Sequence, residues 1–132
     1  MLLPLPAATV RNLLLEYHLS LLSVRRGAGT AELLVNLARA MYLTYFLQEA
    51  GYGTPSFSQF HEAEDAMERA NRWGYETGIW MLDDAGYPLF EAIVNLHDRQ
   101  LAKAPAHAVL SADDRLSRFV AGSLRSPLPP AR

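Results

Sequence analysis

Apolar residues recur every three or four positions along most of the chain, which is the spacing of one face of an α-helix. The first such stretch runs from about Thr9 to Arg25 and ends before Gly27, a residue that commonly stops helices. Six apolar residues share its inward face: Val10, Leu13, Leu14, Tyr17, Leu21 and Val24. Three more leucines narrow the polar face: Leu15, Leu19 and Leu22. We therefore predict a first helix with little polar surface.

A second helix is predicted from about Thr30 to Ala50. Thr30 is a good N-cap residue, because its side-chain oxygen can accept a hydrogen bond from a free N–H of the first turn. Gly51 and Gly53 are expected to end the helix, and Pro55 prevents it from resuming. The short link before Thr30 predicts that the first two helices form an antiparallel hairpin.

The second half of this helix is unusually apolar. Glu32, Asn36 and Arg39 lie along one line of the helix surface, which should face water. Continued toward the C-terminus, the same line reaches Leu43 and Phe46. A helix that is apolar all round must be covered on every side.

Two arrangements would provide this cover. Either the fourth and fifth helices wrap the second half of the helix, or a second copy of the chain does, as in a homodimer. Aromatic and other large apolar side chains are typical of the centre of such an interface. The candidate interface residues are Tyr42, Leu43, Phe46 and Leu47.

Five further segments complete the expected organisation. A third helix is predicted from Ser56 to Gly74, and a short extended connection over residues 75–82, where aromatic and β-favouring residues gather. A fourth helix is predicted from Pro88 to Lys103 and a short fifth helix from Ser111 to Ala121. Residues 122–132 have the composition of a flexible, Pro-rich tail.

The fold class that follows is all-α: a compact bundle of four to five helices around a long central helix at about residues 30–50. Residues 1–121 form the single helical domain and residues 122–132 the tail, in a chain whose 132 residues suit one domain.

Composition excludes several classes of protein. The chain has no cysteine, which excludes disulfide frameworks and thiolate metal sites, and its formal net charge of −2 gives no sign of a polyanion partner. The longest apolar run, residues 33–47, is too short and too interrupted to span a bilayer. The N-terminal residues 1–6 lack the features of a signal peptide, so we expect a cytoplasmic protein with no membrane partner.

His97 is the most informative titratable residue because it lies on the apolar face of the fourth helix. Such a histidine is either a hydrogen-bonded core residue or the base of a pocket. Asp98 points to the other side of the helix and is not expected to orient it. His18 can approach His97 in a folded bundle, and Tyr17 and Tyr45 complete the candidate pocket.

No catalytic or metal-binding motif is present. Residues 61–68 hold the densest group of carboxylates with a histidine, but opposite charges at i, i+4 spacing there are typical of a solvated, salt-bridged helix face. The chain has no Glu-x-x-His and no HExxH sequence. Residues 27–30 lack the lysine of a phosphate-binding loop. We expect no catalytic residue, no metal and no cofactor.

Two small basic sets are the candidate nucleic-acid contacts: Arg25 and Arg26, and Arg115 and Arg118. A DNA-binding surface needs several such residues on one face. The third helix exposes mainly acidic residues, so no clear recognition helix is predicted.

Two stretches carry a resemblance to known proteins, Ala38–Gly51 and Leu96–Pro105. They resemble a group of short, uncharacterised helical proteins of proteobacteria, some of which are automatically labelled Fis-family transcriptional regulators. This resemblance implies a helical fold and, through the label, DNA binding. It carries over no functional residue, since the shared patterns are packing patterns.

The sequence therefore favours a non-enzymatic helical protein–protein interaction module, either homodimeric or partner-binding. One alternative is a DNA-binding transcriptional regulator. A second is a small-ligand binder or enzyme with a pocket around His97.

Overall fold

The structure is a computed structural model that describes residues 6–25, 27–52, 57–122 and 126–128. Its helices are α1 (Ala7–Arg25), α2 (Ala31–Glu49), α3 (Phe57–Thr77), α4 (Gly86–Lys103) and α5 (Ala106–Ala121). Within these ranges there is no strand, and Gly29 and Trp80 form an isolated antiparallel bridge. The predicted all-α class is confirmed, and the five helices of the described residues agree with the predicted four to five.

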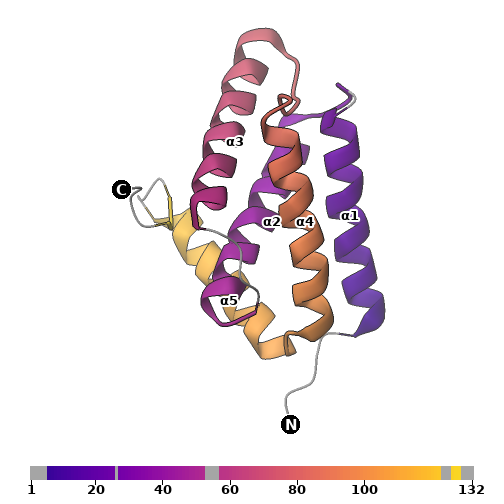
Figure 1. Cartoon of the computed structure of the whole chain (residues 1–132), viewed down its shortest axis with the longest axis vertical. Helices are drawn as coiled ribbons and strands as arrows, with labels where there is room; N and C mark the ends of the chain where they lie inside the picture. Colours follow the sequence, from indigo (N-terminus) through magenta and orange to yellow (C-terminus); the bar gives the residue numbers. More distant parts are fainter. Residues whose placement is uncertain (1–5, 26, 53–56, 123–125, 129–132) are drawn as a thin grey trace.

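The helices pack around α2, which contacts each of the other four. Figure 1 shows α1, α2 and α4 running roughly alongside one another, with α3 extending past them at one end and α5 crossing α2 obliquely near the other. At 19 residues α2 is not the longest helix, since α3 has 21. Its importance lies in its contacts rather than its length.

The ends of α2 form as their local sequence predicts. The backbone N–H of Leu33 donates to Oγ1 of Thr30 at 3.2 Å, the expected N-cap bond. Gly27 and Gly51 have φ values of 76° and 101°, a conformation that glycine adopts at little cost. The first of these glycines turns the chain from α1 into α2, and the second ends α2.

The apolar half of α2 is covered by its own chain. Leu43, Phe46 and Leu47 are 6%, 3% and 0% exposed. Helix α5 covers Phe46, and the guanidinium carbon of Arg115 lies 4.3 Å from the centre of the Phe46 ring. Tyr42 is half-buried and bonded to Glu64 of α3. Of the two arrangements considered above, wrapping by the chain itself is the one observed, and these side chains do not form an open interface.

Two predicted helix boundaries, at the end of α3 and the start of α4, are wrong. Helix α3 continues past Gly74 to Thr77, and the extended connection begins only after Gly78, which has a φ of 78°. Helix α4 begins at Gly86, because the backbone N–H of that glycine donates to Oδ1 of Asp83 at 2.7 Å and caps the helix there. The predicted connection over residues 75–82 is therefore helical in its first part and extended in its second.

Helix α5 is longer than predicted. It begins at Ala106, directly after Pro105, and Ser111 lies in its interior. Pro105 has the extended backbone of an N-cap, and the residues that follow include good helix formers. The apparent capping pattern at Ser111 therefore marks no boundary.

Part of the predicted flexible tail is described. Leu128 is 6% exposed and belongs to the hydrophobic core, and Ser126 donates a hydrogen bond to Glu64. Residues 123–125 and 129–132 lie outside the described residues. In the ranges that the structure describes, none of the helices combines the length and apolar character that crossing a bilayer requires.

Trp80 holds the end of α3 against the turn between α1 and α2. A Cβ added at Gly74 would overlap the Trp80 indole, so the ring lies directly on the backbone of α3. The backbone of Trp80 also forms the bridge to Gly29, where an added Cβ would overlap the carbonyl of Trp80. Glycine is required at both contacts because only its backbone allows so close an approach.

This packing predicts that Gly74→Ala destabilises the protein, although alanine is the better helix former by about 1 kcal/mol. Overpacking against the Trp80 ring costs about 1–3 kcal/mol and should outweigh that gain. Because the added Cβ would overlap several atoms of the Trp80 ring, the cost should lie in the upper part of that range. Urea unfolding followed by circular dichroism should therefore show a net loss of about 1–2 kcal/mol.

Gly122→Ala is the matched control, because a Cβ there meets only backbone oxygens at 3.4 Å. Its unfolding free energy should stay close to that of the unsubstituted chain. A Gly74→Ala variant as stable as the unsubstituted protein would contradict the close contact with Trp80.

Candidate functional site

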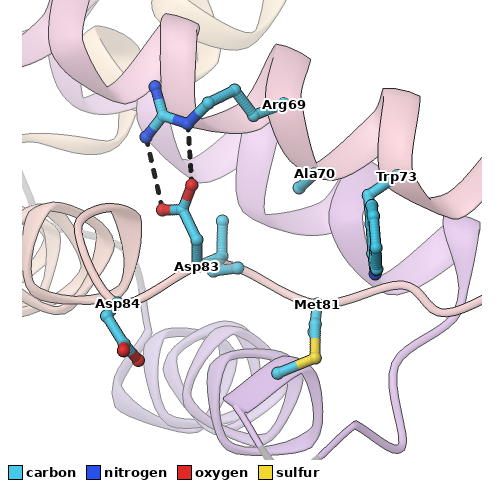
Figure 2. Close-up of a pocket in the computed structure, with 7 residues that line it drawn as sticks. Arg69, Ala70, Trp73, Met81, Asp83 and Asp84 are labelled. Atoms are coloured by element: carbon cyan, nitrogen blue, oxygen red, sulfur yellow. Dashed lines mark hydrogen bonds and ion pairs between the residues drawn. The ribbon is translucent and has the colours of Figure 1, made fainter.

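An apolar groove lies between the C-terminal half of α3 and the connection to α4. Its volume is about 460 Å³. The lining residues are Arg69, Ala70 and Trp73 from α3, and Met81, Leu82, Asp83 and Asp84 from the connection. We refer to it as the Trp73 groove; Figure 2 shows these side chains.

Trp73 gives the groove its apolar character. Its side chain is 49% exposed, whereas Ala70 and Leu82 are buried at 3% each. Figure 2 shows Trp73 and Met81 toward one end of the groove and the Arg69–Asp83 pair toward the other. A side chain of another molecule that entered the groove would therefore contact the exposed indole of Trp73 and the apolar surface beside it.

The polar end of the groove is held by a two-point ion pair. Nε and Nη2 of Arg69 donate to the two carboxylate oxygens of Asp83 at 2.7 and 3.3 Å. The hydrogen bond from Arg69 is the main reason that the pKa of Asp83 lies below its ordinary value. Because Asp83 also caps α4 at Gly86, the pair joins α3 to the start of α4.

Asp84 differs from its neighbour. Its carboxylate is exposed and points away from the Arg69–Asp83 pair (Figure 2). Within the described part of the chain it forms no ion pair. The charges of Arg69 and Asp83 offset each other, so Asp84 leaves this end of the groove negative.

More apolar residues are exposed near the Trp73 groove. Tyr75 is 82% exposed and Ile79 is 44% exposed. The Tyr75 ring stands edge-on to Trp80, with their centres 5.0 Å apart. The end of α3 thus presents a tryptophan and a tyrosine to solvent, and the connection after it presents an isoleucine.

The predicted pocket around His97 exists only in part. A cavity of about 280 Å³ is lined by His97 and Tyr17, with Arg39 and Asp113 also in its wall. The Tyr17 and His97 rings pack edge to face at 5.5 Å. Arg39 and Asp113 form an ion pair at 3.0 Å.

The other two residues of that candidate pocket lie elsewhere. Nε2 of His18 is 2.8 Å from Oδ2 of Asp98, so His18 pairs with the aspartate rather than with His97. Tyr45 packs against Phe60 with ring centres 5.4 Å apart. The structure therefore brings together His97 and Tyr17 and separates His18 and Tyr45 from them.

Hydrogen bonds determine which nitrogen of His97 carries the proton. Nε2 of Gln100 donates to the carbonyl oxygens of Thr44 and Tyr52, at 3.0 and 2.7 Å. Its Oε1 is therefore turned to Nδ1 of His97 at 3.2 Å, and since an amide oxygen only accepts, Nδ1 must donate. Burial lowers the pKa of His97, so the neutral ring, protonated at Nδ1, is the favoured form.

The candidate nucleic-acid contacts are occupied by partners within the chain. Arg115 pairs with Glu49 at 3.0 Å and Arg118 with Asp114 at 2.7 Å. The guanidinium of Arg25 lies over the Tyr87 ring, 4.5 Å from its centre. Arg26 lies outside the described residues. In the described ranges no group of three or more His, Asp or Glu residues could hold a metal ion.

Comparison with protein-family models, with curated proteins and with solved structures found no match to this chain. The resemblance to helical proteobacterial proteins accordingly stays a prediction. Any function must follow from the surfaces described above.

The buried His97 predicts a specific loss of stability in acid. Its folded-state pKa lies below that of the unfolded chain, which is about 6.5, so the unfolded state takes up the proton first. The stabilisation is present above that pH and is lost as the pH falls. His97→Asn retains an N–H near the position of Nδ1 but cannot titrate, so the fall in unfolding free energy between pH 7.5 and 5 should be smaller than in the unsubstituted chain.

His107→Asn is the control, because His107 is exposed. It should preserve the full pH dependence, measured by urea unfolding at each pH. An unchanged slope in His97→Asn would show that His97 does not resist protonation in the folded state.

Proposed function

We propose that this chain is a non-enzymatic helical interaction module that binds a segment of a partner protein in the Trp73 groove. The proposal rests on one observation: the half-exposed Trp73 lies beside a buried apolar surface. The Arg69–Asp83 ion pair holds the two walls of this groove, α3 and the connection to α4, together. Such a site needs little rearrangement on binding, which lowers the entropy lost when a partner docks.

The composition of this surface supports a protein partner. Residues that dominate binding energy at protein interfaces are enriched in tryptophan, tyrosine and arginine, and lysine is depleted. Two of these residue types, Trp73 and Arg69, line the groove from adjacent turns of α3. A volume of about 460 Å³ suits one or two large side chains and leaves the rest of a partner on the rim.

Charge indicates the chemistry of that partner. An apolar side chain would fill the space beside Trp73, and a basic residue a few positions away would meet Asp84. We therefore propose a segment that carries a large apolar residue close to a lysine or arginine. Opposite charges at an exposed rim raise the association rate more than the final affinity.

The other functions have less support. The homodimer version depends on four predicted interface residues, of which Leu43, Phe46 and Leu47 are buried and Tyr42 is half-buried. The DNA-binding alternative depends on arginines that pair with carboxylates or an aromatic ring. A small-ligand function keeps one favourable observation, the cavity at His97, whose ring is held in one tautomer.

The test is selection of peptides from a displayed random library on the immobilised full chain, with counter-selection on Trp73→Ala. We expect a consensus of a large apolar residue near a basic residue. Calorimetry on the selected peptides should show affinity falling about 30-fold in Trp73→Ala, since truncation of a central tryptophan typically costs about 2 kcal/mol or more. Asp84→Asn should weaken binding less, and mainly at low salt.

Val120→Ala is the control because Val120 is 72% exposed and belongs to α5, away from the groove. It should bind the peptides as tightly as the unsubstituted chain. Selection of the same peptides by Trp73→Ala, or of none by either protein, would contradict the proposed site.

A further inference from the structure

A second surface involves Ser126, Pro127 and Leu128, which follow α5 and return to the side of the bundle. Ser126 donates a hydrogen bond from its hydroxyl to Oε2 of Glu64 on α3. The backbone N–H of Leu128 donates to the hydroxyl oxygen of Ser126 at 3.1 Å. Leu128 is 6% exposed, so this short bent segment has both a polar anchor and an apolar one.

The polar anchor is a carboxylate within the packed surface. The side chain of Glu64 is only 16% exposed, and it also accepts a hydrogen bond from the hydroxyl of Tyr42 on α2 at 2.8 Å. Burial, together with Glu64, raises the pKa of Tyr42, so its hydroxyl keeps the proton that it donates. A half-buried carboxylate needs such donors, and Ser126 supplies one of them.

An aromatic surface surrounds residues 126–128 and continues past Pro127. The rings of Tyr42 and Phe119 pack with their centres 5.5 Å apart. Next to Pro127 lies an open hollow of about 510 Å³, which is also lined by Phe46, Phe119, Arg115 and Arg118. Three consecutive residues therefore lie along an aromatic surface that continues on one side of them.

These contacts have the character of peptide recognition. The Ser126 hydroxyl donates to a carboxylate, the Leu128 side chain is buried, and Pro127 between them fixes one backbone dihedral angle. Two side-chain anchors on a backbone of limited freedom are typical of a short bound peptide. None of the three residues belongs to a helix, so the segment can leave without breaking a helical hydrogen bond.

We propose that the surface around Glu64, Tyr42 and Phe119 is a binding groove for Ser-Pro-Leu peptide segments, and that the chain's own residues 126–128 occupy it as an internal inhibitor. A partner with the same three-residue chemistry binds there by displacing the internal segment. Attachment to the same chain gives that segment a millimolar effective concentration, which holds back weak competitors.

The test uses the full chain in two forms and a fluorescent peptide with the sequence of residues 122–132. In Ser126→Ala/Leu128→Asp both anchors of the internal segment are lost, so the groove should be open. Fluorescence anisotropy should show the peptide binding this variant at least about tenfold more tightly than the unsubstituted chain, as expected from loss of an internal competitor. A peptide carrying the same two substitutions should not bind.

Two further variants in the open background identify the groove. Glu64→Gln should weaken peptide binding several-fold, because it removes the charge that accepts the serine hydroxyl. Trp73→Ala should leave peptide binding unchanged, since Trp73 lies nine residues further along α3, about 14 Å at 1.5 Å per residue. Unchanged binding by Trp73→Ala would show that this peptide does not bind in the Trp73 groove, so the two proposed sites can be tested separately.

Three results would overturn the proposal. The peptide would bind both forms of the chain equally, or neither. Alternatively, Ser126→Ala/Leu128→Asp would lose its helical circular dichroism, which would make residues 126–128 a required part of the core rather than a separable ligand.

Discussion

The need to cover α2 on every side governs the arrangement of this protein. One line along the surface of α2 is polar in the first half of the helix, where it carries Glu32 and Arg39, and apolar in the second half. The other four helices, α1, α3, α4 and α5, all pack against α2. Burial of one large apolar side chain contributes about 1.5–3 kcal/mol, so exposure of both Leu43 and Phe46 would remove a large share of a typical folding free energy. Helix α5 lies obliquely across α2 because the apolar second half is where cover is needed (Figure 1).

A bundle built around such a helix must still satisfy its buried polar groups. Gln100 of α4 does this by donating to the carbonyl oxygens of Thr44 and Tyr52, while its own oxygen accepts from His97. The hydroxyl of Thr44 donates to the carbonyl oxygen of Ala40 one turn earlier. Unpaired, each of these groups would cost about 1–3 kcal/mol. The network therefore fixes how α4 sits on α2.

Both proposed binding surfaces lie on α3, whose two ends are used differently. Near its start, Glu64 meets Tyr42 and the segment that follows α5. Near its end, Trp73 is half-exposed beside the connection to α4, which Trp80 and Asp83 attach to α3. Helix α3 packs mainly against α2 and α4.

Local sequence determined where the helices form, the Thr30 cap and the large apolar surface of α2. It could do so because helix periodicity, capping and glycine conformations depend on residues only a few positions apart. It also indicated that His97 faces inward. The tertiary structure alone decided that α5 rather than a second chain covers Phe46, that His18 meets Asp98 instead of His97, and that Arg69 and Asp83 frame a groove at Trp73. These contacts join residues up to 80 positions apart, and their geometry depends on how whole helices cross.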